Sequence, residues 1–85
     1  MNKNAIYVKV YKLYSYSDNN TVDSFMEALS DKAVISKECS NELIITASSD
    51  IIDVSEIHNM AIKFFGQIAY NIDIIGMLGP FKKCR

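Results

Sequence analysis

The stretch from residue 5 to residue 14 alternates two kinds of side chain with a period of two. The two sets are Ile6, Val8 and Val10 on one side and Tyr7, Lys9 and Tyr11 on the other. A helix would mix the two sets, so the alternation predicts a β-strand with two chemically different faces. We expect the aliphatic set to face the core and the Tyr-Lys-Tyr set to lie on an open face of the sheet.

A helical pattern follows a polar turn at residues 15–20. Its apolar residues recur at spacings of three and four, as Val22, Phe25, Met26, Leu29 and Ala33. This spacing predicts an amphipathic helix of about three turns. Asn20 or Thr21 is expected to cap its start, because short polar side chains accept hydrogen bonds from free helical N–H groups.

Two β-prone runs come next, at residues 33–39 and 42–48, and only Ser40 and Asn41 separate them. A connection this short is typical of a β-hairpin. On the second run the alternation predicts two faces. Leu43, Ile45 and Ala47 should face the helices, and Ile44, Thr46 and Ser48 should lie opposite.

A second helix is indicated by Asp53 and Glu56, whose spacing matches that of a capping box. Its expected core stripe is Ile57, Met60, Ala61, Phe64 and Ile68, with Gly66 inside the helix and Asn71 as its C-terminal cap. The apolar run 72–78 predicts a last strand. Residues 81–85, which include Lys82, Lys83 and Arg85, are expected to form a short basic tail.

The predicted order is strand, helix, strand, strand, helix, strand. This is the split β-α-β pattern of ferredoxin-like α+β domains, in which four antiparallel strands carry two helices on one face. The first and third strands are central in that arrangement. Since 85 residues suffice for one core and not for two, we expect a single domain spanning residues 1–85.

The composition limits the classes of partner. The net charge of −1 argues against a binder that neutralises many phosphates. There is no signal-peptide pattern and no run of apolar residues long enough for a membrane span, so we expect a cytoplasmic protein without a membrane partner. Cys39 and Cys84 are too few for a disulfide framework and are expected to be reduced thiols.

The candidate site is the open sheet face together with the basic tail. Its residues are Tyr7, Lys9, Tyr11, Lys12, Ile44, Met77, Lys82 and Lys83. Tyrosines interleaved with lysines can stack bases and hold phosphates, as in RNA-recognition modules, but the third strand carries no aromatic residue. The same face can serve as a protein interface or be buried in a homodimer, and all three readings stay open.

The sequence contains no pattern that indicates catalysis. His58 is the sole histidine, and the nearby Asp53 and Ser55 are explained as helix-start residues. Three glycines, at 66, 76 and 79, provide no phosphate-binding loop, and His58 with two distant cysteines provides no metal site. We therefore expect no enzymatic activity, no metal and no cofactor.

In its size, its richness in Lys, Ile and Asn, its single arginine and its lack of enzyme motifs, the chain resembles the small early proteins of T-even-type bacteriophages. Many of those proteins bind and inactivate a host toxin, nuclease or defence factor. The resemblance implies an inhibitor of such a host protein that acts in the host cytoplasm, with RNA bridging the contact as a variant. A structural homodimer is the alternative.

Overall fold

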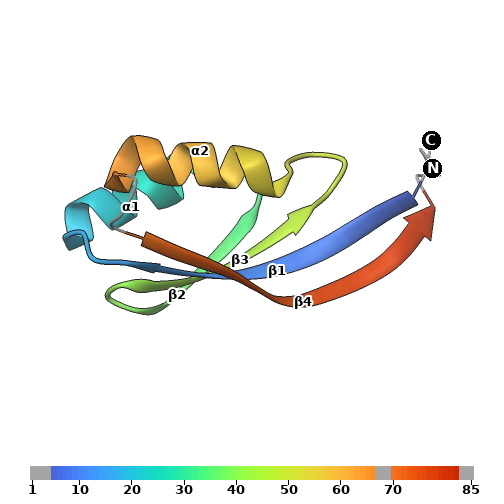
Figure 1. Cartoon of the computed structure of the whole chain (residues 1–85), viewed down its shortest axis with the longest axis horizontal. Coiled ribbons are helices and arrows are strands. Elements are labelled where there is room, and N and C mark those ends of the chain that lie inside the picture. The colour runs from blue at the N-terminus through green and yellow to red at the C-terminus, as the bar shows by residue number, and fades with distance from the viewer. Residues whose placement is uncertain (1–4, 67–69, 83–85) are drawn as a thin grey trace.

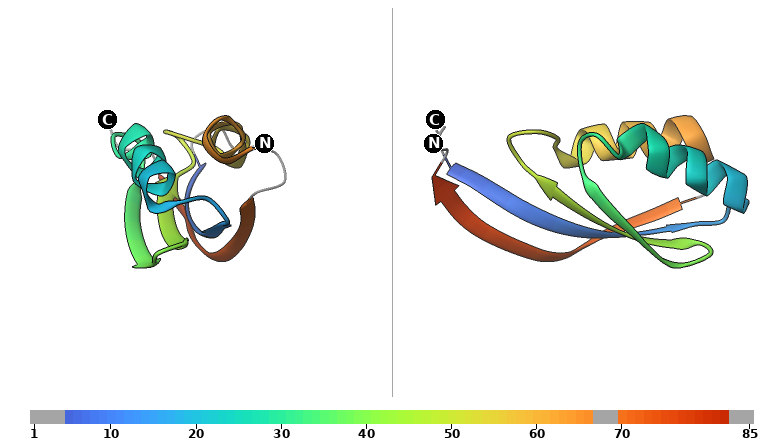
Figure 2. Two further views of the ribbon diagram at one scale, coloured as in Figure 1. Left: turned by 90° about the vertical axis from the view of Figure 1, so that its left-hand side faces the viewer. Right: turned by 180° about the vertical axis from the view of Figure 1, so that it is seen from behind.

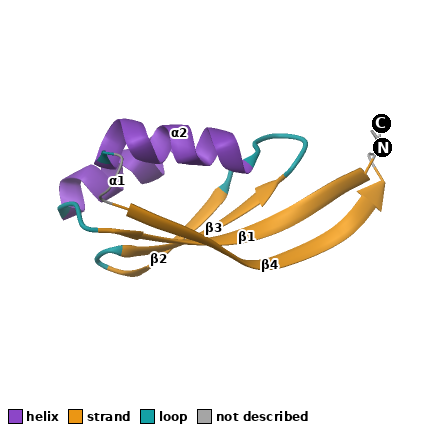
Figure 3. Ribbon diagram, in the orientation of Figure 1, coloured by secondary structure: helices purple, strands orange, loops and turns teal. Residues whose placement is uncertain are grey.

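The computed structural model describes residues 5–66 and 70–82 and contains the six predicted elements in the predicted order. They are β1 (Ala5–Ser15), α1 (Asn19–Leu29), β2 (Val34–Cys39), β3 (Glu42–Ser48), α2 (Val54–Phe65) and β4 (Tyr70–Lys82). All pairings between the strands are antiparallel, and the strand order is β2-β3-β1-β4, so β1 and β3 are central as expected. The two helices lie on one face of the sheet (Figures 1 and 3). The α+β fold of the ferredoxin-like type is thus confirmed.

The core lies between the helices and one half of the sheet. Four elements contribute buried apolar residues at their own period, namely Tyr11 and Leu13 of β1; Leu43, Ile45 and Ala47 of β3; Val22, Phe25 and Leu29 of α1; and Ile57, Ala61 and Phe65 of α2. Phe25 of α1 is the aromatic centre, because its ring contacts the rings of both Phe64 and Phe65 of α2. The predicted inward face of β3 is confirmed.

The phase predicted for β1 is wrong. Tyr11 is only 1% exposed and lies in the core beside Leu13, so the set Tyr7, Lys9 and Tyr11 faces the helix side of the sheet. Ile6, Val8 and Val10 accordingly lie on the open face. The reason is that the helices cover only the later part of β1. In that part the odd-numbered residues Tyr11 and Leu13 are buried, and the even-numbered residues Lys12 and Tyr14 are exposed.

Both helices begin at an aspartate whose side chain accepts a backbone hydrogen bond. Asp18, rather than Asn20 or Thr21, caps α1 by accepting from the Thr21 N–H at 2.8 Å. Asp53 caps α2 as predicted, accepting from the Glu56 N–H at 3.0 Å. These bonds satisfy donors that have no partner within the helix.

The end of α2 and the length of β4 differ from the prediction. The helix stops at Phe65, and Gly66 is its C-terminal cap with a φ of 88°, so Gly66 is not inside the helix and Asn71 is not the cap. Asn71 lies instead in β4, which runs to Lys82. Phe81 and Lys82 therefore belong to a strand and not to a tail. Ile68 and residues 83–85, including Lys83 and Cys84, lie outside the described residues.

The long strands β1 and β4 extend as a two-stranded ribbon past the helices (Figures 1 and 2). This ribbon gives the molecule principal extents of 40 × 21 × 20 Å. Within residues 5–66 and 70–82, neither α1 nor α2 has both the length and the apolar character of a membrane span.

Candidate docking surface

The protruding end of the β1–β4 ribbon is the most unusual surface of the molecule. We call its residues 5–10 and 74–82 the arm. The ladder between β1 and β3 ends where Val8 pairs with Ser48, whereas the ladder between β1 and β4 continues to the pair of Ala5 with Lys82. The tip of the arm is therefore held by two strands alone, and the helices lie over the other half of the sheet (Figure 2).

Large apolar side chains follow β4 along the arm. Five of them are between 47% and 61% exposed: Ile74, Ile75, Met77, Leu78 and Phe81. Single exposed apolar residues are ordinary on protein surfaces, but five within one short segment of a strand concentrate apolar surface in one part of the molecule. β4 is also an edge strand, so its outer backbone groups have no neighbouring strand in the described sheet.

The register distributes these side chains over both faces of the arm. On the open face Ile6 lies opposite Phe81 and Val8 lies opposite Leu78. On the helix side Met77 lies opposite Lys9. The predicted place of Met77 on the open face is thus wrong, because a register shift between Val10 and Tyr11 inserts an extra residue into β4 and changes its phase. Met77 is exposed because no helix reaches it.

Glycine is required where the arm bends at its second register shift, between Ile6 and Val8. Gly79 has a φ of 126°, in a region that side-chain-bearing residues rarely adopt. A Cβ added at Gly79 would lie 2.8 Å from the Ile6 carbonyl oxygen and 3.1 Å from the Tyr7 ring. The close approach of the two strands therefore depends on the missing side chain.

The arm is fastened at Tyr7 to the loop that follows β3. The Tyr7 N–H donates to the Ser49 hydroxyl oxygen at 3.0 Å, and the Ser49 N–H donates to the Tyr7 carbonyl at 2.8 Å. These two bonds extend the pairing by one residue beyond β3. Beyond this point β1 and β4 continue as two strands alone.

The other sequence-predicted residues are divided between the arm and the body of the protein. Lys12 lies on the open face and forms an ion pair with Glu42 at 3.3 Å. Ile44 of β3 pairs directly with Lys12 in the sheet. Lys82 ends the arm. Tyr11 cannot contact a partner because it is buried, and both burial and the nearby Asp53 carboxylate raise the pKa of its hydroxyl. The structure thus does not bring the predicted residues together in one patch.

Charge is segregated between the ribbon and the rest of the chain. β1 carries Lys9 and Lys12 with no acidic residue, and β4 carries Asp73 and Lys82. Residues 16–66 contain three lysines and nine acidic residues, which are Asp18, Asp23, Glu27, Asp31, Glu38, Glu42, Asp50, Asp53 and Glu56. The apolar arm is therefore part of a basic ribbon on an acidic body.

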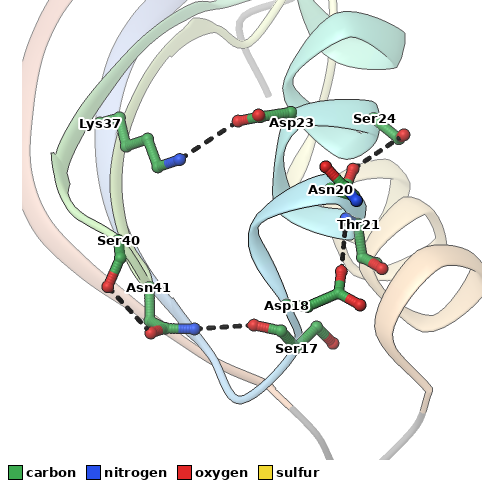
Figure 4. A network of polar contacts seen from close by, with 9 residues as sticks. All are labelled: Ser17, Asp18, Asn20, Thr21, Asp23, Ser24, Lys37, Ser40 and Asn41. Atoms are coloured by element: carbon green, nitrogen blue, oxygen red, sulfur yellow. Dashed lines mark hydrogen bonds and ion pairs between the residues drawn. The ribbon is translucent and has the colours of Figure 1, made fainter.

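The end of the molecule opposite the arm is closed by polar contacts (Figure 4). The Asn41 side-chain amide in the β2–β3 turn donates to the Ser17 carbonyl at 2.8 Å. Lys37 of β2 forms an ion pair with Asp23 of α1 at 3.2 Å. These contacts join the hairpin to the start of α1.

His58 has a structural contact that the sequence did not reveal. Its Nδ1 lies 3.0 Å from the Tyr70 hydroxyl, so α2 is joined to the first residue of β4. Within residues 5–66 and 70–82, no cluster of three or more His, Cys, Asp or Glu side chains could hold a metal ion. Cys39 is an exposed free thiol.

Comparison of the chain with protein-family models, with curated proteins and with solved structures found no match.

Proposed function

We propose that this chain is a small non-enzymatic binding module that docks onto a protein through the arm. The observation that supports the proposal is the run of five half-exposed apolar side chains on β4, more than any other element exposes. Such a surface is unfavourable in water and becomes favourable when a partner covers it.

The size of the effect is appropriate for a specific contact. Complete burial of one Ile, Leu, Met or Phe side chain stabilises by about 1.5–3 kcal/mol, so covering the exposed half of five contributes at most roughly 4–8 kcal/mol. A micromolar complex requires about 8 kcal/mol after the losses of association. The arm can thus supply much of the affinity, and charged groups or backbone pairing must add to it.

A protein partner is favoured over RNA by the placement of the aromatic residues. Base stacking on this topology uses exposed aromatics on the two central strands. Tyr11 is buried, and β3 has no aromatic residue. Tyr14 and Tyr16 are exposed and in edge contact with each other, but they lie at the end of β1 away from the arm.

The class of target follows from the resemblance to small phage early proteins. We propose a host toxin, nuclease or defence factor as the protein that the arm binds and inhibits, in the host cytoplasm. The inhibition requires only that the arm covers a functional surface of the target, so no catalytic step belongs to the proposal.

The test is a pull-down from host lysate with a matched pair of double variants. Leu78→Ser with Phe81→Ser removes apolar surface from the arm, and Val34→Ser with Ile51→Ser removes comparably exposed apolar surface from the body. We expect the arm variant to lose captured protein and the body variant to retain it, with no effect of ribonuclease. Equal capture by wild type and arm variant contradicts the proposal, and loss after ribonuclease identifies an RNA-dependent contact instead.

A further inference from the structure

The edge of the described sheet farthest from β4 is formed by β2. Residues 34–37 of β2 pair regularly with β3, and a register shift follows between Lys37 and Cys39. Every second residue of such an edge strand directs its N–H and C=O groups outward. Within residues 5–66 and 70–82, the backbone groups of residues 34–37 have no hydrogen bond outside the pairing with β3. The outer edge of β2 is therefore able to pair with another extended segment.

A groove lies beside this edge, between β2 and α1. It has a volume of about 550 Å³ and is lined by Met26, Glu27, Ser30, Ala33, Val34 and Ile35. α1 lies above the β2 side of the sheet, as the end-on view in Figure 2 shows. Ile35 faces the helices, because it pairs with Ile45, whose side chain belongs to the core. Ile35 and Met26 are only partly buried, so an added segment can pack apolar side chains against both.

The rim of the groove carries two exposed carboxylates. Glu27 lines the groove itself, and Asp31 lines a second hollow at the start of β2. The two hollows are continuous, because both are lined by Ser30, Ala33 and Val34. Among the ion pairs of residues 5–66 and 70–82, none includes Glu27 or Asp31.

The lysines near the groove are already paired with other carboxylates. Lys37 contacts Asp23 at 3.2 Å, and Lys32 contacts Glu56 at 3.9 Å. The charge left on the rim is therefore negative. Such a rim attracts a basic side chain and repels the phosphates of a nucleic acid or a phospholipid.

We propose that the β2 edge is a second docking site, which takes an extended segment of a partner protein as an added strand. In such strand addition the backbone hydrogen bonds give affinity, and the pockets for alternate side chains give specificity. The segment places an apolar side chain over Ile35 and a lysine or arginine beside Glu27 and Asp31. The inference does not rest on the arm, because β2 and β4 are opposite edges of the sheet.

β2 suits strand addition better than the opposite edge does. β4 contains Pro80, which has no N–H, and its pairing with β1 has two register shifts. Val34 pairs with Thr46, so its side chain points to the open face of the sheet and not toward α1. The body variant of the pull-down, Val34→Ser with Ile51→Ser, therefore leaves the outer backbone edge and Ile35 unchanged.

The experiment is an NMR titration of the isotope-labelled chain with two synthetic peptides that have blocked ends. The first is Thr-Lys-Thr-Val-Thr-Val-Thr, whose lysine and valines share one face when it is extended, and the second has Glu in place of Lys. We expect the lysine peptide to shift the amide signals of residues 33–37 most, with a dissociation constant on the order of 100 μM to 1 mM. The glutamate peptide is expected to bind about fivefold more weakly.

A matched pair of variants tests the acidic rim. Glu27→Lys is expected to weaken binding of the lysine peptide by about fivefold and to strengthen binding of the glutamate peptide. Asp73→Lys makes the same change of net charge at an exposed position of β4 and should leave both affinities unchanged. The dispersion of the amide signals shows that each variant is folded. Asp31→Lys provides the same test if Glu27→Lys does not fold.

Four results would overturn the inference. Signals of residues 33–37 that stay unchanged up to about 2 mM peptide exclude strand addition at β2. Shifts centred on β4 place the contact at the other edge. Equal binding of the two peptides to wild type excludes recognition by the acidic rim. Broadening of the β2 signals that rises with protein concentration in the absence of peptide identifies a second copy as the occupant.

Discussion

The helix-covered body and the arm both contain parts of β1 and β4, but the apolar side chains of these strands are buried in the body and exposed in the arm. In the body, β1 contributes Tyr11 and Leu13 to a core that α1 and α2 close. In the arm, the same strand and β4 carry apolar residues that nothing in the described chain covers. The difference shows that strand length, and not strand composition, decides which part of this sheet is core and which part is available surface.

The largest expected difference in stability is between a side-chain truncation in the body and one in the arm. Phe25→Ala removes a fully buried ring that contacts Phe64 and Phe65, and we expect it to lower the free energy of unfolding by about 3–5 kcal/mol. Leu78→Ala, in the arm, is expected to lower it by about 1 kcal/mol or less at low protein concentration. Urea unfolding measures both. Equal losses would mean that the arm is packed as firmly as the body.

A smaller contrast is expected between two glycines with positive φ. Gly79→Ala introduces a Cβ 2.8 Å from the Ile6 carbonyl oxygen, whereas Gly66→Ala introduces one with no atom within 4 Å. Backbone conformation alone costs about 1–2 kcal/mol in each, and the clash adds to it only at Gly79. Thermal unfolding should show the larger drop for Gly79→Ala. A reversed order would contradict the described approach of the two strands.

The smallest expected effect tests the burial of Tyr11 through pH. Burial, followed by the Asp53 carboxylate, raises the pKa of its hydroxyl above 10.0 in the folded chain. Its contribution to stability is therefore complete below that ordinary value and is lost as the pH rises through the higher folded value. We expect Tyr11→Phe to retain stability further into the alkaline range than wild type does.

Urea unfolding measured at intervals from pH 8 to about pH 11 compares the two proteins. If the free energies of unfolding of wild type and Tyr11→Phe fell in parallel with pH, the Tyr11 hydroxyl would lie in solvent, as the alternation in residues 5–14 predicts.

The order of elements, the central strands and the faces of β3 could all be predicted from the sequence. The hairpin around Ser40 and Asn41 and the Asp53 cap depend on local chemistry, which a sequence displays. Leu43, Ile45 and Ala47 are buried as expected, since their side chains belong to the core that the helices close. In this part of the chain, the apolar pattern of the sequence agrees with the burial seen in the structure.

The phase of β1 and the extent of β4 could not be predicted in the same way. The aliphatic residues at 6, 8 and 10 suggested a core face, but they lie in the part of β1 that has no helix above it. Leu13, which lies in the helix-covered part of β1, indicates correctly which face of the strand is buried. In β4, Gly76, Gly79 and Pro80 suggested an early end, yet β4 is an edge strand and accommodates them through its register shifts.

The residues predicted for the candidate site thus lie on the expected strands but not on one face of the sheet. Lys12 and Ile44 lie on the open face, whereas Met77 and Lys82, opposite Lys9 and Ala5, lie on the helix side and are exposed there. Leu78 and Phe81 were not among the expected residues, because they follow or adjoin the turn-forming residues Gly79 and Pro80. The unequal strand lengths, 11 and 13 residues against 6 and 7, are the signal that would have found them.

Amide hydrogen exchange of the isolated chain tests most directly whether the arm is an uncovered surface. We expect the amides from Ile74 to Phe81 to exchange faster than those of Leu43 to Ala47 in the body, because β4 is an edge strand whose apolar side chains are exposed. Protection of the arm amides as strong as that of the body amides would contradict this account.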